Sequence, residues 1–161
     1  MSTRRFLSSC AAWFLLSLAA MPASAQADRD ACTLLTPAEV GAAVGVAVTA
    51  GSHVTPTYVK TCTWNVSGSS NVKTVTLFLQ TAASYDSGKK LALQMAAATT
   101  STAFKAASVG DDGYYFVAGD QVGLLVKKGG LAFKVAVYAT LPVDRKQAME
   151  LALARNVVAK L

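Results

Sequence analysis

Two adjacent acids and two adjacent tyrosines are the side chains whose types and spacing best suit ligand binding. A single glycine separates Asp111 and Asp112 from Tyr114 and Tyr115. Carboxylates beside aromatic rings can bind a cationic or sugar-like ligand, because the charges attract the cation and the rings contact its apolar face. We therefore expect a ligand-binding site at these four residues. In the alternative interpretation, the acids only shape the turn before the aromatic run.

The only histidine, His53, supports a second alternative. Paired with Asp111 or Asp112, it could act as a general base in a small periplasmic enzyme. The sequence contains no Gly-x-Ser-x-Gly elbow, phosphate-binding loop, dinucleotide-binding fingerprint or His-Glu-x-x-His zinc motif. We therefore expect a non-catalytic domain, with no cofactor and no metal, that binds a protein or a small ligand.

The first residues have the pattern of a secretory signal peptide. Arg4 and Arg5 precede a largely apolar stretch, and Ala23-Ser24-Ala25 offers small residues for cleavage before Gln26. This pattern predicts a signal peptide over residues 1–25, a single domain over residues 26–161, and a periplasmic or secreted protein.

Other interpretations of this segment fit the residues less well. An uncleaved membrane anchor needs about 20 apolar residues, more than this stretch provides. A lipoprotein carries its cysteine after the apolar stretch, whereas Cys10 precedes it. Residues 3–7 match a twin-arginine signal in part, so the export route stays open.

Export decides how the remaining cysteines, Cys32 and Cys62, are interpreted. An exported protein folds where disulfides persist, and the sequence has neither a Cys-x-x-Cys motif nor a histidine or basic residue adjacent to either cysteine. We expect a structural disulfide between Cys32 and Cys62. It would close a loop of about thirty residues and contribute roughly 3 to 4 kcal/mol in the chain-entropy model.

Size and charge restrict the partners. Removal of 25 residues from 161 leaves 136, which suits one domain. The leader holds two of the 15 basic residues, so 13 basic and nine acidic residues give the remainder a net charge of +4. Because the lysines are dispersed, we expect no nucleic-acid binding. Attachment to an anionic envelope surface is a further alternative.

The first predicted helix has clear end signals. Thr36 can cap it, Pro37 suits its first position, and Glu39 completes a capping box. Gly45 can end it, because glycine readily adopts the left-handed conformation that follows many helices.

Two longer segments also have helical patterns. In residues 84–99, Leu91, Met95 and Ala98 recur at helical spacing, and we expect them to face the sheet. Residues 142–161 predict a third helix, capped by Asp144.

Five segments have the alternation or the flanking turns of strands: 58–66, 72–80, 114–118, 121–128 and 131–138. The turns between successive strands are too short for parallel crossovers. The order α-β-β-α-β-β-β-α predicts an α+β domain, with an antiparallel sheet of about five strands and helices packed on one face.

Three groups of landmarks resemble a family of small exported bacterial domains, many of them lipoproteins, whose function is not established. The landmarks are Cys32-Thr33-Leu34-Leu35-Thr36-Pro37-Ala38-Glu39-Val40, Cys62-Thr63-Trp64, and Val109-Gly110-Asp111 with Tyr114-Tyr115. The resemblance implies an envelope location and an α+β fold, and it implies no catalytic residues. This chain departs from the family because it has no lipobox cysteine at the expected place.

Overall fold

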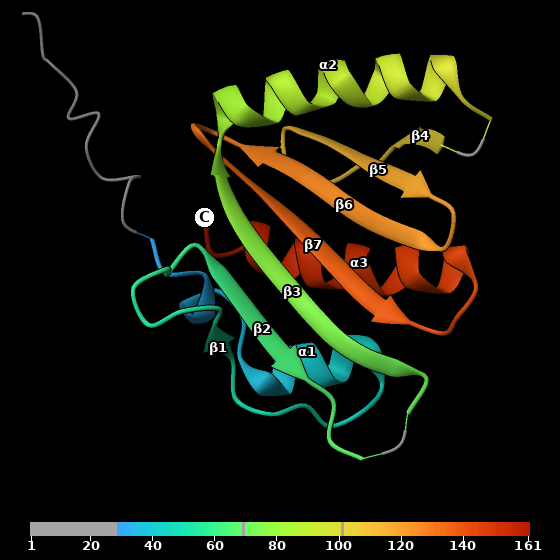
Figure 1. Cartoon of the computed structure of the whole chain (residues 1–161). Helices are drawn as coiled ribbons and strands as arrows, with labels where there is room; N and C mark the ends of the chain where they lie inside the picture. Colours follow the sequence, from blue (N-terminus) through green and yellow to red (C-terminus); the bar gives the residue numbers. More distant parts are fainter. Residues whose placement is uncertain (1–28, 69, 101) are drawn as a thin grey trace, which may run out of the picture.

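One antiparallel sheet of seven strands forms the centre of the protein, in the spatial order β1-β2-β3-β7-β6-β5-β4 (Figure 1). The computed structural model describes residues 29–68, 70–100 and 102–161. The strands are β1 (Ser52–His53), β2 (Thr61–Asn65), β3 (Val72–Thr81), β4 (Thr102–Ala106), β5 (Asp112–Ala118), β6 (Gln121–Lys128) and β7 (Leu131–Ala139). The helices are the 3-10 helix η1 (Ala31–Thr33), α1 (Pro37–Val44), α2 (Ala82–Ala98) and α3 (Val143–Val158). The predicted signal peptide lies outside the described residues.

The predicted α+β class is confirmed, with two strands more than the five expected. The additions are the edge strands β1 and β4. Ser52–His53 pairs with Cys62 and Thr63 of β2, in a segment for which no strand was predicted. Strand β4 pairs with all but the first two residues of β5. Both edge strands are short, so neither produces an extended alternating pattern.

The helices cover both faces of the sheet, whereas the sequence predicted one. Figure 1 shows α2 on one side of the sheet and α1 and α3 on the other. Consecutive residues of β5 contact helices on opposite faces. The ring of Tyr114 packs 5.4 Å from that of Tyr85 of α2. The hydroxyl of Tyr115 instead donates to the Gln147 carbonyl of α3 at 2.9 Å.

The sheet separates two hydrophobic clusters of unequal size. The larger lies on the α1 and α3 side and includes Trp64, Leu77 and Phe133, all fully buried. The smaller lies under α2, and its buried members are Tyr85, Ala92, Tyr114 and Ala132. Helix α2 is therefore attached by only two buried side chains of its own.

The helix ends confirm the predicted start and end of α1, move the start of α2 and correct the predicted cap of α3. Thr36 accepts from the Glu39 N–H and Glu39 accepts from the Thr36 N–H, so the capping box is present. Helix α2 begins two residues earlier than expected because Thr81 accepts from the Ser84 N–H. The predicted cap of α3, Asp144, lies inside its first turn.

The predicted disulfide is confirmed. Cys32 and Cys62 are joined with a Cα–Cα separation of 5.0 Å, so η1 is linked covalently to β2. Among the described residues, no helix combines the length and the apolar character needed to cross a membrane.

Candidate functional site

The four residues predicted to bind a ligand do not form one site. Asp112 and Tyr114 face α2, where Asp112 pairs with Lys89 at 2.6 Å. Tyr115 faces the opposite side of the sheet and is buried. Asp111 precedes β5 and lies at the turn that follows β6. Only Asp112 and Tyr114 are therefore brought together.

The two acids have structural partners. Asp111 accepts from Lys128 Nζ and from the Gly129 N–H, each at 2.7 Å, and these bonds hold the pKa of its carboxyl below the usual value. The hydrogen bond from Lys89 likewise lowers the pKa of Asp112. Both acids are thus carboxylates near neutral pH, with their charges already opposed by lysines.

An apolar groove of about 250 Å³ lies between α2 and the sheet, beside Tyr114. Its lining consists of Gly88, Leu91, Ala92, Met95, Tyr114, Phe116, Leu125 and Lys134. Apolar pockets that carry a single charged group are typical of small-molecule sites, because the apolar lining supplies affinity and the charge orients the ligand.

The groove exists because α2 does not turn its predicted apolar residues toward the sheet. Tyr85 and Ala92, seven residues apart, face inward instead. Leu91 is 57% exposed and Met95 42% exposed, so the expectation that they face the sheet is wrong. A bulky tyrosine at the start of the helix takes the inward position, and Leu91 and Met95 are left along the groove wall.

Lys134 provides the only charged side chain of the groove lining. Its aliphatic part lies across Gly123 of β6, where an added Cβ would come within 2.6 Å of Lys134 Cε. Among residues 29–161 without 69 and 101, it forms no ion pair. The ammonium group is thus available to an anionic ligand.

Lys127, next to the groove, differs from Lys134 because it has an ion-pair partner. Lys127 Nζ pairs with Asp86 at 2.6 Å and lies 5.5 Å from the ring centroid of Tyr85. Burial is the main cause that raises the pKa of the Tyr85 hydroxyl far above its usual value, so this phenol stays protonated. These contacts hold α2 against the sheet. Among the described residues, Lys134 is the lysine of the groove lining that has no ion-pair partner.

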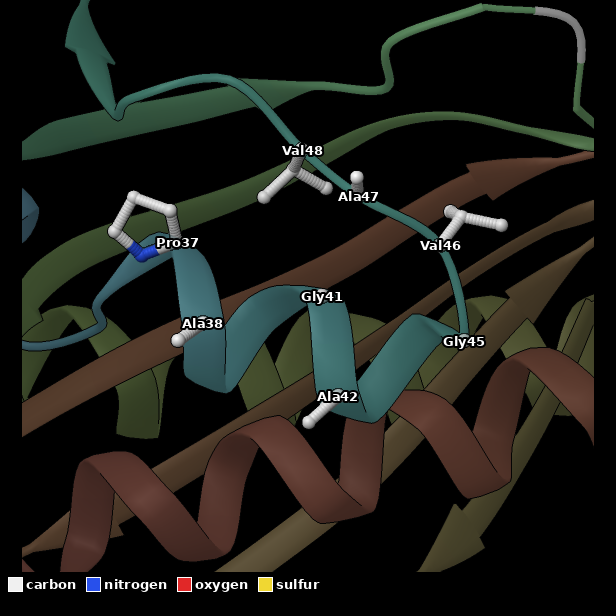
Figure 2. Close-up of a pocket in the computed structure, with 8 residues that line it drawn as sticks. All are labelled: Pro37, Ala38, Gly41, Ala42, Gly45, Val46, Ala47 and Val48. Carbon is white, nitrogen blue, oxygen red and sulfur yellow. The ribbon is translucent and has the colours of Figure 1, made fainter.

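Another hollow, of about 460 Å³, lies along α1 (Figure 2). Its lining has only proline, glycine, alanine and valine side chains: Pro37, Ala38, Gly41, Ala42, Gly45, Val46, Ala47 and Val48. In Figure 2 the Val46–Val48 segment runs along the helix, and Ala38 and Ala42 project from the helix away from it. No polar side chain is present to orient a ligand, so the groove beside α2 is the better candidate site.

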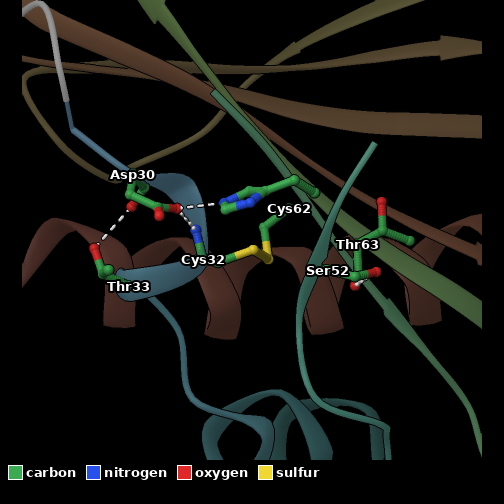
Figure 3. A network of polar contacts seen from close by, with 7 residues as sticks. Asp30, Cys32, Thr33, Ser52, Cys62 and Thr63 are labelled. Atoms are coloured by element: carbon green, nitrogen blue, oxygen red, sulfur yellow. Dashed lines mark hydrogen bonds and ion pairs between the residues drawn. A yellow bond between two sulfur atoms is a disulfide. The ribbon is translucent and has the colours of Figure 1, made fainter. Parts of the chain in front are cut away.

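His53 is paired with Asp30, not with the acids named by the enzyme interpretation. His53 Nε2 lies 2.8 Å from Asp30 Oδ1, and the same oxygen accepts from the Cys32 N–H at 2.7 Å (Figure 3). The hydrogen bond from His53 is the main cause that lowers the pKa of Asp30. Strands β1 and β5 have four strands between them, so His53 and Asp112 lie on the order of 20 Å apart.

Of the four residues predicted to bind a ligand, only Tyr114 lines the groove, and Lys134 was not among the predicted residues. Residues 131–139 alternate only weakly, because buried residues lie on both sides of β7. A single lysine between Phe133 and Val135 was the one available signal that this part of the strand reaches solvent.

The protein is an α+β domain, with a seven-stranded antiparallel sheet that carries helices on both faces and an apolar groove beside α2. No protein-family model matches the chain, and neither the curated proteins nor the solved structures contain a match to it. The resemblance to small exported bacterial domains stays a prediction, and the function must be argued from the groove itself.

Proposed function

We propose that the protein is an exported, non-catalytic binding domain whose ligand is a small amphipathic carboxylate. The apolar part of the ligand would occupy the groove beside α2, and its carboxylate would meet Lys134. One observation carries the proposal: an apolar groove has at its wall a lysine with no carboxylate partner among the described residues.

The apolar lining supports a ligand with a hydrocarbon or aromatic body. Leu91 and Met95 expose large parts of their side chains in the free protein. Covering them removes apolar surface from water, which favours binding by roughly 25 cal/mol for each Å². The groove is smaller than most drug-sized sites, which favours a compact or medium-chain ligand over a protein segment.

The charge of Lys134 supports an acid rather than a neutral molecule. The neighbouring lysines Lys89 and Lys127 already have Asp112 and Asp86 as partners. An ammonium group at the edge of an apolar groove is partly desolvated when a ligand binds, so its attraction for a carboxylate exceeds that between fully exposed charges. The proposed ligand therefore has its carboxylate at one end.

Octanoate and octanol provide a direct test, because they differ only in the group that would meet Lys134. Isothermal titration of the purified protein should show binding of octanoate, with octanol several-fold weaker. Lys134→Gln should remove the difference between the two ligands. Lys90→Gln is the matched control, since Lys90 is an exposed lysine of α2 outside the groove lining.

A second variant pair tests the position of the apolar part. Leu91→Glu places a charge in the groove and should weaken octanoate binding more than about tenfold, because a carboxylate would be buried beside the ligand. Leu93→Glu changes the same residue type on the same helix, and Leu93 is 47% exposed outside the lining. Equal affinities of the two variants would contradict the proposed site.

A further inference from the structure

Three side chains that can ligate a metal meet where η1, β1 and β2 come together, and a fourth is bonded to one of them. Single ligand atoms of Asp30, Cys32 and His53 all lie within 4.8 Å of one another. Cys62 Sγ is bonded to Cys32 Sγ at 1.96 Å, so it is one bond away from this group of three. Figure 3 shows Asp30 beside the disulfide, with contacts that link it to the η1 backbone.

We propose that reduction of the Cys32–Cys62 disulfide converts this cluster into a zinc site, with Asp30, Cys32, His53 and Cys62 as its four ligands. In the oxidised protein the two sulfurs are bonded to each other and are not thiolate ligands. Reduction releases two thiolates beside an imidazole and a carboxylate. Two sulfur ligands, one nitrogen and one oxygen suit tetrahedral zinc, whose structural sites use these ligand types.

The redox step needs a dithiol reductant, which transfers two electrons. A thiolate of the reductant attacks Cys32 Sγ, the disulfide bond breaks, and Cys62 leaves as a thiolate that takes up a proton. The second thiol of the reductant then displaces Cys32, and the reductant becomes a disulfide. Zinc binding then releases the two thiol protons. In the overall reaction, the protein disulfide, the dithiol and Zn²⁺ are consumed. The products are the zinc dithiolate, the oxidised reductant and two H⁺.

Exposure supports this order of events. Cys62 is fully buried, whereas Cys32 is partly exposed and is therefore the sulfur that a reductant can reach. The side chains of His53 and Asp30 are 24% and 33% exposed, so they lie on the open side of the cluster.

Contacts other than the disulfide keep the ligands together after reduction. His53 and Cys62 are directly opposite each other in the β1–β2 pair. The Ala31 N–H donates to the Val59 carbonyl at 2.8 Å, which holds η1 against the segment before β2. Ala31 itself is fully buried in the larger core. These contacts would keep η1, β1 and β2 together after the Cys32–Cys62 disulfide is reduced.

Zinc binding requires the ligand atoms to move. Zinc bonds of about 2.0–2.3 Å in a tetrahedral arrangement put neighbouring ligand atoms roughly 3.3–3.8 Å apart. Asp30 Oδ1 and His53 Nε2, now 2.8 Å apart, must separate by about half an ångström. The sulfurs must also separate, which reduction permits.

The test uses the purified protein with and without treatment by a phosphine reductant, titrated with Zn²⁺ and, for spectroscopy, with Co²⁺. We expect one zinc for each reduced chain and none for the oxidised chain. Cobalt should give the intense visible bands of a tetrahedral site and the near-ultraviolet charge transfer of thiolate ligands. Circular dichroism before metal addition checks that the reduced chain is folded.

Variants separate a four-ligand site from a pair of free thiols. His53→Ala and Asp30→Ala should each weaken zinc binding more than about tenfold in the reduced protein. Asp86→Ala, an acid of α2 outside the cluster, should leave it unchanged. The doubly substituted Cys32→Ala, Cys62→Ala chain should bind no zinc under either condition.

Three results would overturn the proposal. One is zinc binding by the reduced chain that neither His53→Ala nor Asp30→Ala alters, since the thiols alone would then be responsible. Another is a folded reduced chain that binds no zinc. The third is a reduced chain that has lost its structure before zinc is added, because the site requires β1, β2 and η1 to be in place.

Discussion

Tyr114 and Tyr115 are adjacent in β5, yet their side chains belong to different hydrophobic clusters on opposite faces of the sheet. The ring of Tyr114 stacks on Phe104 at 4.7 Å and lines the groove beside α2. Tyr115 packs in the larger core and donates to the Gln147 carbonyl. Neighbouring residues therefore belong to different parts of the fold: Tyr114 lines the groove and Tyr115 packs in the larger core.

Removal of the two hydroxyl groups should have unequal effects on stability. Tyr115→Phe loses a partly buried hydrogen bond to α3, so the free energy of unfolding should fall by about 1 kcal/mol. Tyr114→Phe should change it by less than about 0.5 kcal/mol, because no hydrogen bond of its hydroxyl is seen within the described residues. Urea denaturation of both variants measures this, and equal losses would contradict the assignment.

Glu150 of α3 is a buried residue whose carboxyl group accepts a backbone hydrogen bond from the sheet. Pairing between β6 and β7 ends at Leu124 and Val135. Beyond this end, the Val137 N–H of β7 donates to Glu150 Oε1 at 3.0 Å. Burial raises the pKa of Glu150 to about 7, and this effect exceeds the lowering by the Val137 N–H and by Lys134 and Lys146.

Stability should therefore decrease as pH rises through the range in which Glu150 ionises. The pKa is about 4.5 when unfolded and about 7 when folded, so between these values the folded chain holds a proton that the unfolded chain has lost. The free energy of unfolding should fall by about 3 kcal/mol from pH 4.5 to pH 8 on this account. Glu150→Gln should remove that slope, as urea denaturation at pH 5 and pH 8 would show. Parallel pH profiles for the two proteins would exclude Glu150 as the cause.

Glycine-to-alanine changes at Gly51 and Gly88 should have opposite signs. A Cβ at Gly51 would lie 2.7 Å from Cys62 Sγ and 2.8 Å from Trp64 Nε1, both held in the core, so Gly51→Ala should lower the melting temperature. At Gly88 of α2 the nearest atom is 3.9 Å away. Gly88→Ala should stabilise the protein by about 0.5 to 1 kcal/mol, because alanine favours a helix interior. Calorimetry of the pair gives both signs.

Gly123→Ala should change ligand binding through Lys134. The new methyl group would occupy the space of Lys134 Cε, which can move because it is the flexible end of a side chain. Octanoate affinity should fall about three- to tenfold while octanol affinity stays the same, since only the charged contact is displaced. A loss of both affinities would instead indicate that the groove itself has closed.

Local signals explain which parts of the fold could be predicted. The capping box of Thr36 and Glu39 and the disulfide of Cys32 and Cys62 follow from residue type and spacing alone, and the structure confirms them. The two-residue strand β1 is set by its pairing with β2, and no pattern in two residues can indicate this.

The candidate site was harder to predict because it depends on how α2 is rotated. Leu91 and Met95 have helical spacing, but Tyr85 and Ala92 provide the inward face. The sequence contains both pairs of residues. Which pair faces the sheet depends on the shape of the sheet surface beneath α2, including the ring of Tyr114. The contact between Asp30 and His53 was likewise invisible, because 23 residues separate two polar side chains in unpatterned segments.

The unequal clusters also set how the protein opens locally. Helix α2 is attached by Tyr85 and Ala92 and by its ion pairs, whereas α1 and α3 pack on the larger cluster. Segments with few buried contacts exchange their amide hydrogens through partial opening, at less than the free energy of global unfolding. Amides of α2 should therefore exchange with deuterium well before those of α3, and a ligand in the groove should slow them selectively. Ligand binding in the groove would thus change the amide exchange rates of α2 and leave those of the rest of the domain unchanged.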